Sequence, residues 1–377
     1  MGNPGIYIHI PFCLKKCPYC DFFSQVANED ETRRFLHQLQ QEIINKAPFY
    51  TTSTFDTVYI GGGTPNRLKS SALMECLDIL KKSFHITSNA EITLELNPEC
   101  IDPEDLKAYE QSGINRLSLG TQSFRDEELK FLGRIHNARK NLDALQLICS
   151  THVFSLACDV ITGLPGQSVD DLQMSLDILQ KFSPEHLSVY TLTVEKETPL
   201  YQWVQKGRIN PLDEEKVNML WKFAHDDLKD KGYSHYEVSN FAKPGYHSRH
   251  NSKYWDDSNY LGFGPSAHSR WGRTRFWNPP DLKSYLDGTY QPVYENMNDE
   301  QWLTERLMLG LRTEKGFNLN TLSIIKHSQP FFDTISRLNS ETETRLLKVE
   351  GNFLKATPEG WMLLDSIIEE LTEKIDC

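Results

Sequence analysis

No stretch of this 377-residue chain approaches the roughly 18 consecutive apolar residues that a membrane-spanning helix requires. The opening MGNPGIYIHI enters a predicted strand almost at once, which leaves no room for a signal or transit peptide. It also lacks the downstream serine or threonine of a myristoylation site. These absences predict a cytoplasmic protein without a transmembrane segment, and they leave peripheral contact with a membrane open.

Positive charge is also scarce. The chain has 40 lysines and arginines against 52 aspartates and glutamates, which gives a formal net charge of -12 at pH 7. Residues 291–377 alone hold nine basic and fifteen acidic side chains, so this region is a poor binder of phosphate. The charge balance predicts that nucleic acid is not a partner.

Cysteine is sparse, with eight in the chain, yet three of them form the pattern CxxxCxxC at Cys13, Cys17 and Cys20. Three thiolates on one short loop can hold a cuboidal iron–sulfur cluster, and because a ferredoxin uses four, one iron stays open for a substrate or cofactor. Structural zinc is the alternative, but no second CxxC or HxxxH pair lies nearby. A disulfide is disfavoured in a chain of intracellular character.

Further motifs follow the cysteine loop HIPFCLKKCPYCDF. They are GGGTP (residues 61–65), ELNPE (95–99), LSLGTQSF (117–124), LGRIHN (132–137), DVITGLPGQ (159–167), HNSKYW (250–255) and GFGPSAHS (262–269). With these motifs the chain resembles the radical S-adenosylmethionine (SAM) superfamily. Within that superfamily it resembles the coproporphyrinogen III dehydrogenase-like branch, which includes the HemW-type heme chaperones. The resemblance covers nearly the whole chain.

The resemblance implies a [4Fe-4S] cluster on Cys13, Cys17 and Cys20, with SAM at the open iron and reductive cleavage of SAM as the chemistry. The positions that match the family's SAM contacts are Tyr7, Tyr19, Gly62, Gly63, Thr64, Glu95, Gln122, Arg134, Asp159, Thr193 and His268. Carboxylates can accept hydrogen bonds from an ammonium or from ribose hydroxyls, and an arginine can hold a carboxylate through two N–H groups. Taken singly, such charges are more often surface ion pairs.

The segment HNSKYW matches HNxxYW, a motif that the family associates with heme handling. A neutral imidazole at His250 can bind heme iron, and Tyr254 and Trp255 can pack against a macrocycle. His247 is a second candidate ligand on the same segment. The alternative is that His250 is a structural histidine and that both aromatic residues belong to the core.

Two departures from the decarboxylating dehydrogenase of this branch affect the functional prediction. Phe22 stands where that enzyme has an additional cysteine, and only twelve residues precede Cys13 where it has an amino-terminal extension. We therefore expect a heme chaperone that transfers heme to an acceptor protein and needs an electron donor. The alternative is a radical SAM oxidoreductase that acts on coproporphyrinogen III or a related porphyrin.

Strand and helix patterns alternate through the first two-thirds of the chain. Apolar or β-branched runs predict strands at residues 6–10, 57–60, 91–96, 116–119, 155–161 and 187–192. Between two of them, the spacing of Leu73, Leu77 and Leu80 predicts a helix over residues 70–84. The alternation predicts an α/β fold, a partial (β/α)6 barrel, with nearly all motifs at the carboxyl ends of the strands.

The pattern changes near residue 292. Helices are predicted at residues 300–311, 319–325, 335–338 and 360–375, with a hairpin at residues 346–356. This combination resembles a smaller winged-helix-like α+β domain. The predicted division is a radical SAM core at residues 1–240, a connecting segment at 241–291 with HNxxYW and GFGPSAHS, and a carboxyl-terminal domain at 292–377.

Overall fold

The structure, a computed structural model, describes residues 2–324, 329–342 and 344–375, and a 12-stranded sheet forms its centre. Six neighbouring strands of the sheet run parallel to one another in chain order. They are β1 (Gly5–Ile10), β2 (Thr54–Gly62), β3 (His85–Leu96), β4 (Arg116–Gln122), β5 (Ser155–Thr162) and β6 (His186–Thr191). β4 is buried along its whole length, as expected of a central parallel strand.

Helices follow each of these strands. They are α1 (Glu29–Lys46), α2 (Ser70–Ser83), α3 (Pro103–Gln111), α4 (Asp126–Phe131), α5 (Ala138–Thr151), α6 (Val169–Gln180), α7 (Pro199–Gln205) and α8 (Glu214–Asp230). A capping box starts α1, in which Asn28 and Glu31 each accept the other's backbone N–H. Ser168 and Asp171 start α6 in the same way.

The sequence prediction of six parallel strands in a partial barrel is confirmed. The sheet stays open, because β6 pairs on its far side with β8 rather than with β1. The strand predicted at residues 91–96 begins six residues earlier, at His85. Its first five residues are exposed or half-buried, and they show no apolar pattern from which a strand could be predicted.

Short strands extend both edges of the sheet. Beside β6 lie β8 (Asn240–Ala242) and β7 (Ser234–Glu237), and beside β1 lie β9 (Tyr260–Phe263), β10 (His268–Trp271), β11 (Thr274–Trp277) and β12 (Val293–Asn296). Two helices, α9 (Arg249–Trp255) and α10 (Leu282–Leu286), connect them. A Cβ at Gly264 would lie 2.5 Å from the His9 carbonyl oxygen, so the glycine of GFGPSAHS lets this segment approach β1.

Glu42 of α1 holds the GFGPSAHS segment in place. Its buried carboxylate accepts hydrogen bonds from the Gly264 N–H (2.9 Å), Asn278 Nδ2 (2.7 Å) and the Tyr285 hydroxyl (2.7 Å). Lys46 lies 2.6 Å from the same carboxylate and balances its charge. The motif therefore has a structural role at the edge of the sheet next to β1.

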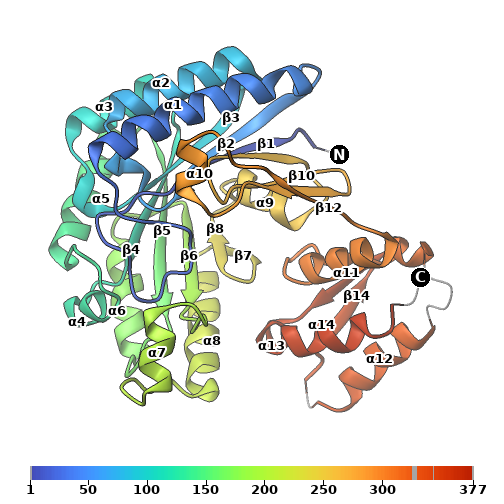
Figure 1. Cartoon of the computed structure of the whole chain (residues 1–377). Coiled ribbons are helices and arrows are strands. Elements are labelled where there is room, and N and C mark those ends of the chain that lie inside the picture. The colour runs from blue at the N-terminus through green and yellow to red at the C-terminus, as the bar shows by residue number, and fades with distance from the viewer. Residues whose placement is uncertain (1, 325–328, 343, 376–377) are drawn as a thin grey trace.

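The carboxyl-terminal elements form a unit with its own apolar core, drawn in orange to red in Figure 1. They are α11 (Asp299–Gly310), β13 (Phe317–Asn318), the 3-10 helix η4 (Leu319–Ile324), α12 (Gln329–Ser340), β14 (Leu347–Glu350), β15 (Phe353–Ala356), α13 (Pro358–Met362) and α14 (Leu364–Thr372). The predicted hairpin is confirmed as β14 and β15, and residue 325 of the predicted helix lies outside the described residues. The predicted helix at 360–375 is broken at Leu363, whose backbone is non-helical (φ -113°, ψ 19°).

Within the described ranges, no helix combines the length and the apolar character that crossing a bilayer requires.

Candidate cofactor site

The carboxyl ends of the parallel strands open onto a cavity of about 920 Å³. Twelve of the predicted site residues line it, namely Cys13, Cys17, Tyr19, Cys20, Gly62, Gly63, Thr64, Glu95, Gln122, Arg134, Asp159 and Thr193. Parallel strands that follow one another in a sheet end on the same side, so the loops after β1 to β6 converge there. The fold thus brings together residues spread over half of the chain.

The cysteine loop is anchored to the loop after β2. The Thr64 N–H donates to the Phe12 carbonyl (2.7 Å), and the Thr64 hydroxyl donates to Cys13 Sγ (3.6 Å). A Cβ at Gly63 would lie 3.0 Å from Cys13 Sγ and 2.7 Å from the Phe12 carbonyl oxygen. A glycine is therefore required where the backbone after β2 passes the first thiol.

The three thiols are half-buried, unpaired by disulfides, and face the cavity from one loop. Burial raises the pKa of Cys20 to about 11, so metal binding there has to displace a proton. Among the described residues, no group of three His, Cys, Asp or Glu side chains has the spacing of a site for a single metal ion. A cuboidal cluster differs from such a site, because each cysteine binds a different iron. The donor set and the glycine beside Cys13 fit a cluster.

Glu95 presents a carboxylate on the β3 side of the cavity. It accepts hydrogen bonds from the Gly62 N–H (3.0 Å) and from the Tyr59 hydroxyl (2.7 Å). Gly62 has φ +112°, and a Cβ there would lie 2.7 Å from the His9 ring. Burial raises the pKa of Glu95 to about 7, and the charge of Asp159 adds to this rise.

Asp159 of β5 is the second carboxylate of the cavity wall. Burial raises its pKa to about 6, while hydrogen bonds from Ser188 and Ser118 act in the opposite direction. The Thr121 hydroxyl donates to the Asp159 main-chain carbonyl (2.6 Å) and joins β5 to β4 at this point. Two half-buried carboxylates that line one cavity form an acceptor surface for ammonium, sulfonium or hydroxyl groups.

Arg134 brings a positive charge close to the cysteine loop. Its Nη2 donates to Asn97 Oδ1 (2.6 Å) and to the Gly120 carbonyl (3.2 Å), while Nη1 lies 4.0 Å from Cys17 Sγ. A guanidinium here can hold a ligand carboxylate or offset thiolate charge. Asn97, which lines the cavity and orients Arg134, was missing from the predicted site, although it lies inside the ELNPE motif.

Gln122 ends β4 in the left-handed backbone region, with φ +63°. A non-glycine residue in this region is uncommon and costs conformational energy, so the surrounding contacts have to impose it. Its side chain is buried at the base of the cavity. The strain is located at one of the predicted SAM contacts.

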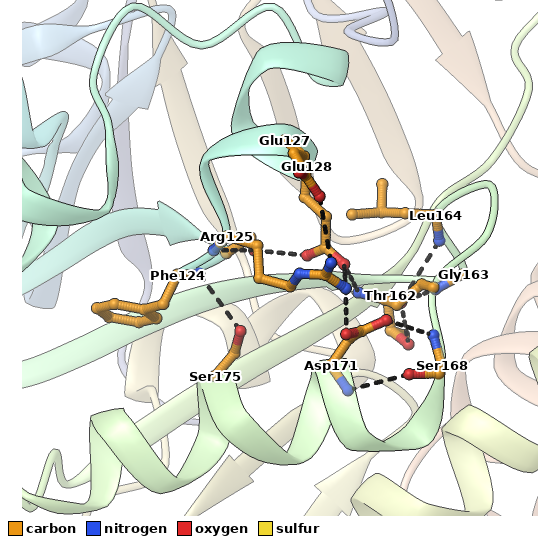
Figure 2. Close-up of polar contacts among 12 residues, drawn as sticks. Phe124, Arg125, Glu127, Glu128, Thr162, Gly163, Leu164, Ser168, Asp171 and Ser175 are labelled. Atoms are coloured by element: carbon orange, nitrogen blue, oxygen red, sulfur yellow. Dashed lines mark hydrogen bonds and ion pairs between the residues drawn. The ribbon is translucent and has the colours of Figure 1, made fainter.

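A polar network holds the loops after β4 and β5 together, and Figure 2 shows its contacts around Arg125 and Glu128. Gln167 Nε2 donates to Glu128 Oε1 (3.2 Å), and Gln167 Oε1 accepts from the Gly163 N–H (2.9 Å). Arg125 pairs with Asp171 in the first turn of α6. The network accounts for the last residues of DVITGLPGQ, which support the loops that follow the strands of Gln122 and Asp159.

Two predicted SAM contacts are not among the residues that line the cavity. The Tyr7 hydroxyl lies 3.0 Å from His9 Nδ1 inside the sheet, and His268 is exposed and stacks on Trp277 with ring centroids 5.4 Å apart. Their roles in SAM binding stay predictions.

His250 is fully buried in α9 and is not among the residues that line the cavity. Its Nδ1 lies 2.9 Å from Thr57 Oγ1 and its Nε2 lies 2.9 Å from the Tyr254 hydroxyl, so both ring nitrogens have hydrogen-bond partners. Burial lowers its pKa to about 3, which keeps the ring neutral. Heme coordination by His250 stays a prediction, and it would require one of these hydrogen bonds to break.

Comparisons with known proteins agree with this geometry. The Radical SAM superfamily model matches residues 7–179, and the HemN C-terminal domain model matches residues 297–363. Among solved structures, the radical SAM enzyme coproporphyrinogen III oxidase (HemN) of Escherichia coli superposes with a TM-score of 0.83. That match covers 98% of this chain and 90% of HemN at 21% identity, so it establishes the fold alone. Fold and cysteine site together define a radical SAM-type protein.

Relatives of higher identity define the family more narrowly. The heme chaperone HemW of Bacillus subtilis is 34% identical to this chain over 82% of this chain and 83% of its own length. HemW of Mycobacterium tuberculosis is 32% identical over 98% and 95% of the two chains. The chain belongs to the HemW family of radical SAM proteins.

Proposed function

We propose that this protein is a heme chaperone, which binds heme alongside a SAM-coordinated [4Fe-4S] cluster and passes the heme to an acceptor protein. The proposal depends on one observation: a single cavity is lined both by the twelve predicted site residues and by the apolar residues 361–364 of the carboxyl-terminal unit. The relatives named heme chaperones, which match up to 98% of this chain, support the choice of cargo.

The residues of the cavity have distinct tasks in this proposal. Cys13, Cys17 and Cys20 would hold the cluster, which with SAM at its open iron supplies one-electron reductive chemistry when bound. Arg134 would bind the carboxylate of SAM, and Glu95 would accept hydrogen bonds from its ammonium or hydroxyl groups. The surrounding loops leave the three thiols half-buried, which would limit the access of water to the cluster.

A titration of the full-length, cluster-reconstituted protein with heme under anaerobic conditions tests the proposal. We expect saturable binding of one heme per chain in the absorbance of the heme band. We also expect transfer of that heme to an apo-protein acceptor such as apomyoglobin. Absence of saturable binding would contradict the heme chaperone function.

The alternative is an oxidoreductase that acts on coproporphyrinogen III, and product analysis with SAM and a reductant distinguishes the two. The likeness to HemN does not favour the alternative, because it shows only the fold. Phe22, which is 63% exposed and lines the cavity beside the cluster loop, replaces the additional cysteine of the decarboxylating enzyme. We expect no decarboxylated product, and its appearance would establish the alternative.

A further inference from the structure

The cavity extends beyond the cofactor residues toward the carboxyl-terminal unit. Its outer part lies between β6, α8 and the β7–β8 turn on one side and the turn from α13 into α14 on the other. We name this outer part the interdomain pocket, and its walls include Tyr190, Trp221, Val238, Arg312, Trp361 and Leu363. Both structural units of the chain contribute to it.

Large apolar side chains face this space without being covered. Tyr190 is 42% exposed and Leu363 is 41% exposed, and they come from opposite walls of the pocket. Phe22 adds a third exposed apolar side chain farther along the same cavity. Exposed apolar residues that gather around one concave space are typical of a site for an apolar ligand.

Two indole rings form the floor of the pocket. Trp221 and Trp361 meet edge to face, with ring centroids 6.3 Å apart and planes at 88°. The indole N–H of Trp361 donates to the Leu311 carbonyl (2.9 Å), and that of Trp221 points to the Val238 carbonyl (3.4 Å). Because both polar groups have partners within the protein, the rings present apolar surface to a ligand.

Arg312 provides the positive charge of the pocket. Its backbone carbonyl accepts the Val238 N–H (3.0 Å), which joins the two units, and its Nη1 donates to the Met308 carbonyl (2.8 Å), which holds the side chain against the end of α11. Its Nη2 lies 2.6 Å from Asp365 Oδ1, and the Asp365 side chain is 91% exposed. An ion pair to so exposed a carboxylate is weak, and a ligand carboxylate can replace it.

Resting on the proposed function, we propose that the interdomain pocket binds the macrocycle of the tetrapyrrole cargo. In this proposal Arg312 binds a propionate carboxylate of the cargo in place of Asp365. None of the described residues that line the cavity is a histidine. In this proposal apolar contact and the carboxylate hold the cargo, and its iron is not needed for binding.

Iron-free protoporphyrin IX and its dimethyl ester are the probes that separate these contributions. Each is titrated against the full-length, cluster-reconstituted protein, with porphyrin fluorescence as the readout. We expect Arg312→Gln to weaken binding of the free acid about tenfold, since one charged hydrogen-bonded pair is lost. Asp365→Asn should strengthen binding of the acid several-fold because it removes the competing carboxylate, and neither variant should change binding of the ester.

Arg337→Gln is the matched control, because Arg337 also pairs with carboxylates (Glu341 and Glu370) on the carboxyl-terminal unit but does not line the cavity. Equal affinities of wild type, Arg312→Gln and Asp365→Asn for the acid would overturn the assignment. Binding of heme without binding of iron-free porphyrin would also overturn it, because the iron would then hold the cargo. If wild type binds neither porphyrin nor heme, the proposed function itself fails.

Discussion

The three thiols of the loop after β1 differ from the other cysteines in what surrounds them. Cys20 faces the cavity, whereas Cys149 packs against the apolar core, with its thiol 3.9 Å from the Phe182 carbonyl oxygen. We expect Cys20→Ser to abolish cluster binding, because a hydroxyl is a poor ligand for iron. Iron and sulfide per chain after anaerobic reconstitution measure the effect. Cys149→Ser is the control and should retain the wild-type content, and full iron in Cys20→Ser would contradict the assigned ligand set.

Gln122 permits a comparison that separates backbone strain from side-chain function. Gln122→Gly and Gln122→Ala both remove the amide that faces the cavity, but only glycine adopts φ +63° at little cost. We expect the glycine variant to be about 1 kcal/mol more stable than the alanine variant in urea denaturation. Both variants should bind SAM more weakly than wild type in equilibrium dialysis. Equal stability of the two would contradict the strain, and unchanged SAM affinity would remove Gln122 from the site.

A histidine pair joins α8 to β7 behind the interdomain pocket. The Nδ1 atoms of His225 and His235 lie 2.7 Å apart, and the His235 ring meets Trp361 of α13 edge to face, with centroids 4.7 Å apart. One Nδ1 has to be the acceptor, so protonation of both rings breaks the bond. Burial lowers the pKa of His235 to about 3, and the neighbouring His225 adds to this effect.

This pair predicts a loss of stability in mild acid. An unfolded histidine titrates near pH 6.5, so below that pH the unfolded chain binds a proton that folded His235 does not. Between pH 7.5 and 5.5, wild type should lose about 1.4 kcal/mol more unfolding free energy than His235→Gln. Urea denaturation at the two pH values measures this difference. Parallel losses in wild type and variant would show that His235 is protonated in the folded protein.

At the scale of the whole molecule, a buried charge cluster fastens the carboxyl-terminal unit to the sheet. The side chain of Glu305 of α11 is 6% exposed and pairs with Arg275 of β11 and with Arg306 (2.7 Å). Arg270 of β10 lies 3.8 Å away. Asp257 also pairs with Arg270 and Arg306, but its side chain is half exposed to solvent. Removal of Glu305 therefore takes away the buried carboxylate that faces these two buried arginines.

Glu305→Ala should therefore lower the unfolding free energy by about 3–5 kcal/mol, the usual cost of breaking a buried ion pair. Asp299→Ala is the control, because Asp299 pairs with Arg273 at the surface of the same helix and its loss should cost about 1 kcal/mol or less. Chemical denaturation of both variants measures the difference. Similar losses would show that the cluster contributes no more than a surface pair.

Local patterns were sufficient to predict β1 to β6, because each is an apolar or β-branched run whose side chains are buried on the sheet. The edge strands β7 to β12 were not predicted, because each has only three or four residues and most lack a continuous apolar or β-branched run. Strands so short depend on their pairing partners rather than on their own pattern. The break at Leu363 was missed for a similar reason, since no proline or glycine marks it.

The sequence by itself determined the parallel order of the strands and, through the family resemblance of its motifs, twelve residues that line one cavity. Consecutive parallel strands end on one side of a sheet, so motifs at their carboxyl ends come together there. Only the tertiary structure decided that His250 is buried with both ring nitrogens engaged, and that Arg312 and Trp221 share a pocket. These facts depend on contacts between segments roughly 90 to 190 positions apart, which no local pattern encodes.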